Sequence, residues 1–121
     1  MKYLVTDDSR MGRKMMIKSL KDLIKEEDEI IEASNGEEAI AQYKEHNPTI
    51  CFMDLTMPVM DGFEATHGIY QYDNNAKIII VSADIQETSK SKAKESGALG
   101  FINKPINQTN LSKMLSGLGL I

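Results

Sequence analysis

Five short apolar runs, which alternate with helix-like segments, most constrain how this 121-residue chain folds. The runs occupy residues 3–5, 30–31, 50–53, 77–81 and 100–103. The third and fourth, ICFM and KIIIV, contain consecutive apolar residues, which is typical of strands buried on both faces of a parallel sheet. Strict alternation of strand and helix therefore predicts an α/β fold, a doubly wound, five-stranded parallel (βα)5 sheet with strand order 2-1-3-4-5.

The segments between the runs carry helix signals. Apolar residues at spacings of three and four predict a helix from Ser9 to about Glu26, with Ser9 or Asp8 as its cap. Residues 34–37, SNGE, have the form of a capping box that opens a second helix, which ends before Pro48. Three further helices are expected at residues 62–72, 86–97 and 107–116.

Composition limits the class of protein. The length fits one domain, and the net charge of -4 argues against nucleic acid as the main partner. A single cysteine, Cys51, excludes a disulfide framework and fits a reducing compartment, which points to the cytoplasm. No apolar run approaches the ~20 residues needed to cross a bilayer, and the first residues lead directly into a strand, so we expect neither membrane insertion nor a signal peptide.

Polar residues follow the predicted carboxyl ends of four strands. They are Asp7 and Asp8, Asp54, Ser82, and Lys104. Parallel strands end at the same edge of a sheet, and sites form there beside the point where strand order reverses. Three carboxylates in one crevice repel one another unless a cation joins them, and a set of oxygen ligands suits Mg²⁺. A metal, a lysine and a hydroxyl around a carboxylate are what an attached phosphoryl group needs, so one carboxylate is a candidate nucleophile that forms an acyl phosphate.

These residues belong to motifs that resemble those of response regulator receiver domains, the CheY-like superfamily, whose fold is shared with flavodoxin. The motifs are DD at residues 7–8, MDLTMPVMDG at 53–62, VSA at 81–83 and KP at 104–105. Their order, spacing and position at successive strand ends carry the likeness, which covers almost the entire chain. We therefore expect residues 1–121 to be one receiver domain without an output domain, either a stand-alone regulator or a piece of a longer chain.

The resemblance implies a role for each matching residue. Asp54 would be the phosphoacceptor and a ligand of Mg²⁺. Asp8 would bind the ion directly, Asp7 would act mainly through a metal-bound water, and the backbone carbonyl of Thr56 would be a further ligand. Lys104 would pair with Asp54 and then with the phosphoryl oxygens.

The resemblance also implies a switch. Ser82 would move inward to donate its hydroxyl to the phosphoryl group, and the ring of Phe101 would turn inward as Ser82 leaves its outer position. Thr56 and Asp84 occupy positions that affect the phosphoryl lifetime in the family, and Asp84 could either order a water or repel one. The helix at residues 86–97 contains Ala93 as its only apolar residue, so we expect a weakly anchored element that changes position on phosphorylation.

The implied function is phosphorelay signal transduction in a two-component system. The donor would be a phosphohistidine on a sensor histidine kinase or a histidine phosphotransfer protein. The chain would catalyse its own Mg²⁺-dependent phosphorylation and dephosphorylation without being a conventional enzyme. A face formed by the fourth helix, fifth strand and fifth helix would bind a downstream protein target, and we expect a monomer with no direct nucleic-acid contact and a Lys104–Pro105 peptide in the cis form.

Three alternatives share parts of this pattern. A flavodoxin-like FMN protein needs a Ser/Thr/Gly phosphate loop after its first strand, where this chain has TDDS. A metal-dependent phosphatase with an aspartyl nucleophile usually has a second acid two residues later, where this chain has Thr56. A receiver-like interaction module that signals without phosphorylation is the main alternative, and the full set of five polar residues argues against it.

Overall fold

The five strands form one parallel sheet, as expected. A computed structural model describes residues 1–57, 59–84 and 86–121 of the chain. The strands are β1 (Lys2–Thr6), β2 (Glu29–Ala33), β3 (Ile50–Asp54), β4 (Ile78–Ser82) and β5 (Gly100–Asn103). They pair in parallel in the order β2-β1-β3-β4-β5, which confirms the predicted topology and places the reversal of strand order between β1 and β3.

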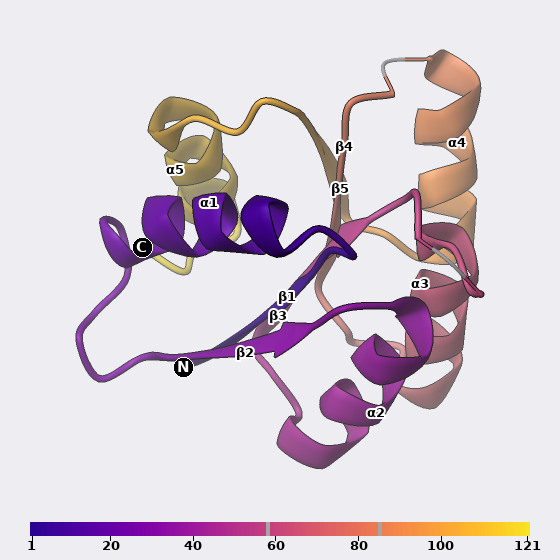
Figure 1. Cartoon of the computed structure of the whole chain (residues 1–121), viewed down its shortest axis with the longest axis horizontal. Helices are drawn as coiled ribbons and strands as arrows, with labels where there is room; N and C mark the ends of the chain where they lie inside the picture. Colours follow the sequence, from indigo (N-terminus) through magenta and orange to yellow (C-terminus); the bar gives the residue numbers. More distant parts are fainter. Residues whose placement is uncertain (58, 85) are drawn as a thin grey trace.

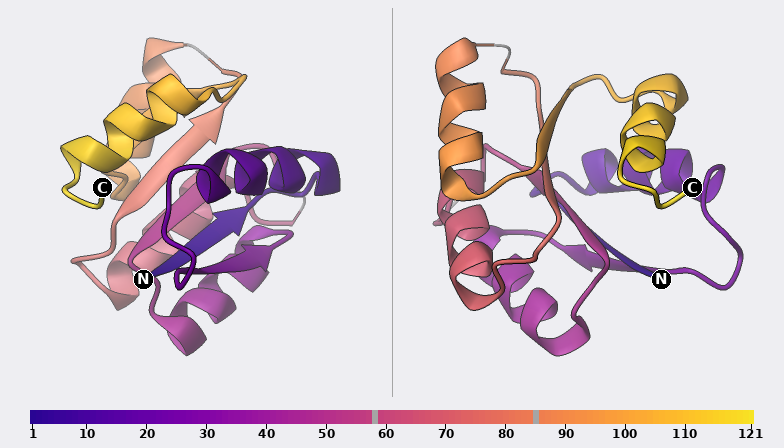
Figure 2. Two further views of the ribbon diagram at one scale, coloured as in Figure 1. Left: turned by 90° about the vertical axis from the view of Figure 1, so that its left-hand side faces the viewer. Right: turned by 180° about the vertical axis from the view of Figure 1, so that it is seen from behind.

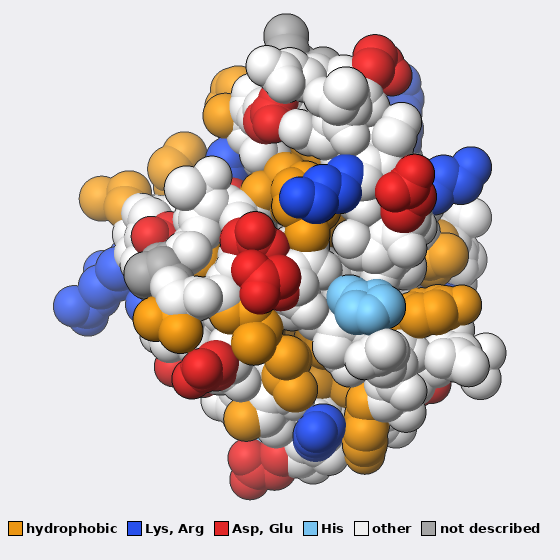
Figure 3. Space-filling model, turned by 90° about the vertical axis from the view of Figure 1, so that its right-hand side faces the viewer, with side chains coloured by type: hydrophobic (Ala, Val, Ile, Leu, Met, Phe, Trp, Pro, Cys, Tyr) orange, Lys and Arg blue, Asp and Glu red, His pale blue; other side chains and the backbone are white. Residues whose placement is uncertain are grey.

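Five helices of the described residues cover the two faces of this sheet, as Figures 1 and 2 show. They are α1 (Arg10–Lys21), α2 (Gly36–His46), α3 (Gly62–Tyr72), α4 (Glu87–Ser96) and α5 (Gln108–Gly117). Helices α1 and α5 lie on one face, and α2, α3 and α4 lie side by side on the other. The outward surface of α2–α4 carries interspersed acidic, basic and apolar side chains (Figure 3).

Two apolar layers hold the helices to the sheet, because alternate residues of the buried strands face opposite sides. On β4, Ile78 and Ile80 pack toward α2–α4, whereas Ile79 and Val81 pack toward α1 and α5. Every residue of β3 and β4 is buried, as the consecutive apolar residues predict. Cys51 belongs to the α2–α4 layer, is completely buried and forms no disulfide among the described residues.

Two local predictions are wrong, namely the end of the first helix and the N-cap of the second. The first helix ends at Lys21 and not near Glu26, because Asp22 takes the C-cap and the amides of both Leu23 and Ile24 donate to the carbonyl of Leu20 at 2.9 Å. The side chains of Leu23 and Ile24 still pack in the apolar layer between the sheet and helices α1 and α5. A turn therefore buries these two residues as a longer helix would.

The predicted capping box of α2 is displaced by one residue. Asn35, not Ser34, is the N-cap, and its side chain accepts the amide of Glu38 at 2.8 Å. Glu38 in turn accepts hydrogen bonds from the backbone and hydroxyl of Ser34. The Lys104–Pro105 peptide bond is cis, as the resemblance implies.

Candidate metal centre at the sheet edge

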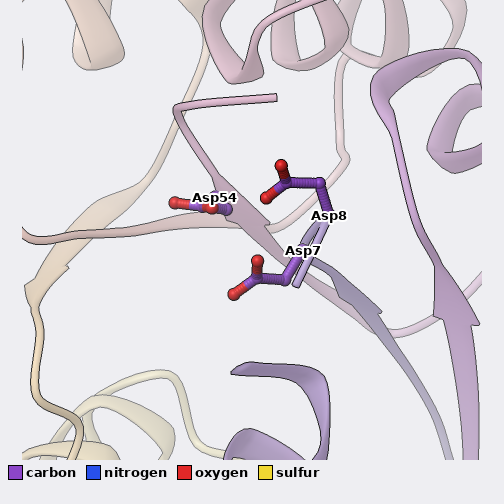
Figure 4. A group of neighbouring side chains, drawn as sticks. All are labelled: Asp7, Asp8 and Asp54. Carbon is purple, nitrogen blue, oxygen red and sulfur yellow. The ribbon is translucent and has the colours of Figure 1, made fainter. Parts of the chain in front are cut away.

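Three carboxylates converge where β1 and β3 end (Figure 4). Asp7 and Asp8 follow β1 directly, and Asp54 is the last residue of β3. One oxygen from each carboxylate lies within 4.8 Å of the others. Asp7 and Asp54 are 6% and 8% exposed, whereas Asp8 is exposed. The donors are oxygens only, and the exposed side leaves access for water and phosphate, so the residues present fit Mg²⁺.

Asp7 is held by contacts from three parts of the chain. Its Oδ1 accepts the amide of Ser9 at 2.9 Å, and its Oδ2 accepts the ammonium of Lys104 at 3.0 Å. A Cβ added to Gly12, in the first turn of α1, would lie 2.9 Å from the Asp7 carboxyl carbon. Only glycine therefore lets α1 approach this carboxylate so closely.

Lys104 lies between two carboxylates. Its Nζ lies 3.6 Å from Asp54 Oδ1, so the expected ion pair with Asp54 is present, and it lies closer still, at 3.0 Å, to Asp7 Oδ2. Burial opposes the positive charge of Lys104, but its hydrogen bond to Asp7 and the charges of Asp54 and Asp7 raise its pKa overall. A fixed ammonium therefore stands beside Asp54.

The electrostatics of Asp54 reflect burial among other charges. Burial raises the pKa of Asp54 to about 6, a shift that the Lys104 charge opposes and the Asp7 charge reinforces. The amide of Leu55 donates to Asp54 Oδ1 at 2.9 Å, which favours the ionised form. At pH 7 most Asp54 side chains are therefore ionised and able to act as a nucleophile.

The pKa of Asp54 predicts a pH-dependent stability in metal-free protein. Because its folded-state pKa of about 6 exceeds the ordinary value of 3.8, the folded protein retains a proton between about pH 4 and pH 6 that the unfolded chain has released. Asp54 therefore destabilises the fold above about pH 6 and stops doing so near pH 4. We expect Asp54→Asn to raise the free energy of unfolding by ~1–2 kcal/mol at pH 7 and to leave it unchanged near pH 4. Urea denaturation in the presence of a chelator measures both values, and an equal gain at the two pH values would contradict this.

The remaining predicted site residues lie on β4, on β5 and in the loop that follows β3. Ser82, the last residue of β4, is buried, and its Oγ accepts the amide of Asp84 at 3.1 Å. Thr56 is exposed, two residues after Asp54. Phe101 on β5 is partly buried, with the Lys90 ammonium 6.0 Å from its ring centroid. Pro58, inside the motif at residues 53–62, lies outside the described residues.

Arg13 is a site residue that the sequence reasoning missed. Its Nη1 donates to the backbone carbonyl of Asp7 at 2.7 Å, and its Nε donates to Glu32 on β2 at 3.1 Å. Arg13 thus ties α1 to the ends of both β1 and β2. No sequence pattern pointed to Arg13. The neighbouring Gly12 indicates only that this turn of α1 packs closely, because a glycine inside a helical pattern costs about 1 kcal/mol relative to alanine and needs a packing reason.

Comparisons with known proteins agree with this geometry. Residues 3–116 match the family model described as response regulator receiver domain. The chain is 40% identical over 114 residues to chemotaxis protein CheY of Halobacterium salinarum, covering 93% of this chain and 92% of the relative. It is 44% identical over 105 residues to chemotaxis protein CheY of Bacillus subtilis, covering 86% and 85%.

Solved structures show the same likeness. CheY in a CheX–CheY–BeF3–Mg²⁺ complex from Borrelia burgdorferi superimposes with a TM-score of 0.84 at 31% identity, covering 97% of this chain and 88% of that one. Vibrio cholerae CheY4 gives a TM-score of 0.86 at 30% identity, with 96% of each chain covered.

Among the described residues, no helix is both long enough and apolar enough to cross a membrane.

The function follows from the family and from these relatives. The family match and the CheY relatives assign the chain to phosphorelay signal transduction, and they favour this function over an interaction module that signals without phosphorylation. The chain belongs to the family of response regulator receiver domains.

Proposed function

We propose that Asp54 accepts a phosphoryl group from a phosphohistidine on a sensor histidine kinase or histidine phosphotransfer protein. The observation that carries this proposal is the convergence of three carboxylates and one ammonium at a single sheet edge. Asp8, Asp54 and the carbonyl of Thr56 would bind Mg²⁺ directly, and Asp7 would hold it through a water. The ion, when bound, neutralises charge on the phosphoryl oxygens.

The side chains of this protein position and stabilise the transfer. An ionised Asp54 oxygen forms the new bond to phosphorus as the bond from phosphorus to the donor imidazole breaks. The Lys104 ammonium, 3.6 Å from Asp54 Oδ1, stabilises negative charge on the transferring group. Attack by water later releases phosphate, so the chain assists its own phosphorylation and dephosphorylation.

The phosphorylated form would act through the face of α4, β5 and α5. A groove of about 630 Å³ lies on this face, and its lining includes Lys90, Phe101, Lys113 and Met114. As Ser82 turns toward the phosphoryl group and Phe101 turns inward, the shape of this groove changes. A downstream protein target would recognise that change. We propose that the chain binds this target as a cytoplasmic monomer.

Mass spectrometry tests the proposed chemistry. Incubation with a small phosphodonor and Mg²⁺ should add one phosphoryl group, and a chelator should prevent the addition. Hydroxylamine, which cleaves acyl phosphates, should remove the adduct. An adduct that forms equally well in chelator, or that resists hydroxylamine, would overturn the assignment of an Mg²⁺-dependent aspartyl phosphate.

A further inference from the structure

Asp8 is the exposed carboxylate of the metal centre, so packing does little to aim it. One of its oxygens nevertheless lies within 4.8 Å of oxygens of Asp7 and Asp54. Because each peptide group is planar, the backbone of Asp8 turns only about its two soft dihedral angles. The peptide planes on its two sides therefore decide where its side chain starts and which way it points.

Hydrogen bonds hold both of these peptide planes. The Asp7 carbonyl, part of the peptide that precedes Asp8, accepts a hydrogen bond from Arg13 Nη1 at 2.7 Å. The Ser9 amide, part of the peptide that follows Asp8, donates to Asp7 Oδ1 at 2.9 Å. The backbone of Asp8 is thus held from both sides, on one of them by Arg13.

Arg13 gives the Asp7 carbonyl a partner that the sheet does not. The pairings of β1 with β2 and with β3 both end at Thr6, one residue before Asp7. Asp7 still donates its amide to the Ala33 carbonyl at 3.2 Å, but its own carbonyl lies beyond the last pair of the ladder. Asp7 is buried, and a buried backbone carbonyl needs a donor. The Arg13 guanidinium is that donor.

Arg13 is itself held in place for this contact. Its backbone amide donates to the Ser9 carbonyl at 3.0 Å, and its Nε donates to Glu32 Oε1 on β2 at 3.1 Å. Its side chain is only 16% exposed. A guanidinium carries its N–H groups in a rigid planar fork, so it can bond the Asp7 carbonyl and Glu32 at the same time.

We propose that Arg13 is a positioning residue for Mg²⁺ binding. It fixes the peptide between Asp7 and Asp8 and so holds the Asp8 carboxylate ready for the ion. The metal step rests on the proposed function. Arg13 acts through Asp8, because a cation cannot be a ligand of a cation. A ligand that is already held in its binding position loses less freedom when the ion arrives, and this strengthens binding.

The charge of Arg13 alone would have the opposite effect. A guanidinium near the three carboxylates repels a divalent cation, so removing only its charge would strengthen Mg²⁺ binding. Loss of the hydrogen bond to the Asp7 carbonyl would weaken Mg²⁺ binding, because Asp8 is then free to turn away. The two explanations therefore predict opposite signs for one substitution.

A Mg²⁺ titration of the full chain, followed by the amide signals of residues 7–9 and 54–56 in NMR spectra, separates the two explanations. Arg13→Gln removes the charge and shortens the side chain, so that it cannot reach both partners. We expect Mg²⁺ to bind about 10- to 100-fold more weakly to this variant than to wild type, the range for residues that orient metal ligands.

Lys14→Gln is the matched control, because it removes one positive charge from the exposed neighbour of Arg13 on α1. This control should bind Mg²⁺ as wild type does or slightly more tightly. Binding of Mg²⁺ to Arg13→Gln that is as tight as binding to Lys14→Gln would overturn the positioning role.

The backbone of Asp8 is tested without metal in the same variants. NMR order parameters of the Asp8 and Ser9 amides should fall from about 0.85 in wild type toward about 0.6 in Arg13→Gln and stay unchanged in Lys14→Gln. Unchanged order parameters in Arg13→Gln would refute the positioning role. If wild type binds no Mg²⁺, the proposed function fails, and the metal-free comparison still decides the role of Arg13. If circular dichroism shows Arg13→Gln to be unfolded, Arg13→Met, which keeps an apolar stem, is held to the same criteria.

Discussion

Asp54→Asn is expected to abolish phosphoryl uptake. The amide is uncharged and cannot form an acyl phosphate, while its oxygen can still accept the Leu55 amide that Asp54 Oδ1 accepts at 2.9 Å. The substitution keeps the size of the side chain, so the loss should be chemical and not a loss of fold. Mass spectrometry after incubation with a small phosphodonor and Mg²⁺ should show one phosphoryl group on wild type and none on the variant.

A matched control separates this effect from a general loss of negative charge. Glu27→Gln also removes one carboxylate, from an exposed position between α1 and β2, and should be phosphorylated like wild type. Uptake of a phosphoryl group by Asp54→Asn at the wild-type rate would place the acceptor on another residue. The higher stability expected for Asp54→Asn at pH 7 gives an independent check that the variant is folded.

Gly62→Ala is expected to destabilise the protein by about 3 kcal/mol. Gly62 begins α3, and its amide donates to the carbonyl of Leu55 at 2.9 Å. An added Cβ would lie 2.9 Å from Leu55 Cα and 3.0 Å from the carbonyl carbon of Asp54, both of them backbone atoms that cannot rotate away. The backbone after β3 must therefore shift, which costs more than moving a side chain.

Gly117→Ala is the control for this prediction. Gly117 is the last residue of α5, and an added Cβ there has nothing within 4 Å. This substitution should leave stability unchanged or raise it slightly, because alanine favours helix. Urea denaturation of both variants measures the difference. A Gly62→Ala variant as stable as wild type would show that the backbone around Asp54 can shift freely.

The sequence predicted the fold best at strands whose apolar residues must be buried on both faces. The uninterrupted apolar residues of β3 and β4 required cover on both faces, and both strands are fully buried. The edge strand β2 was predicted only at Ile30 and Ile31, because its outer residues Glu29 and Glu32 are exposed and carry no apolar signal. The predicted end of α1 was wrong because a helix and a turn both place Leu23 and Ile24 in the apolar layer beneath α1 and α5.

The sequence predicted which residues at the strand ends come together in the site, but not the contacts between their side chains. Parallel strands end at one edge, so the order of β1 and β3 alone brings Asp7 and Asp54 together. The preference of Lys104 for Asp7 over Asp54 rests on distances of 3.0 and 3.6 Å between residues far apart in sequence, which no local pattern encodes. The reach of Arg13 to the Asp7 carbonyl likewise depends on side-chain conformation.

The complete burial of Cys51 has a practical consequence for chemical labelling. Burial raises the pKa of its thiol to about 12, so almost no thiolate exists at neutral pH, and reagents in solvent cannot reach the sulfur. Toward maleimide dyes the folded chain therefore behaves as if it had no cysteine. A single fluorophore attached on α4 through Glu95→Cys would report on that helix in an otherwise unaltered background.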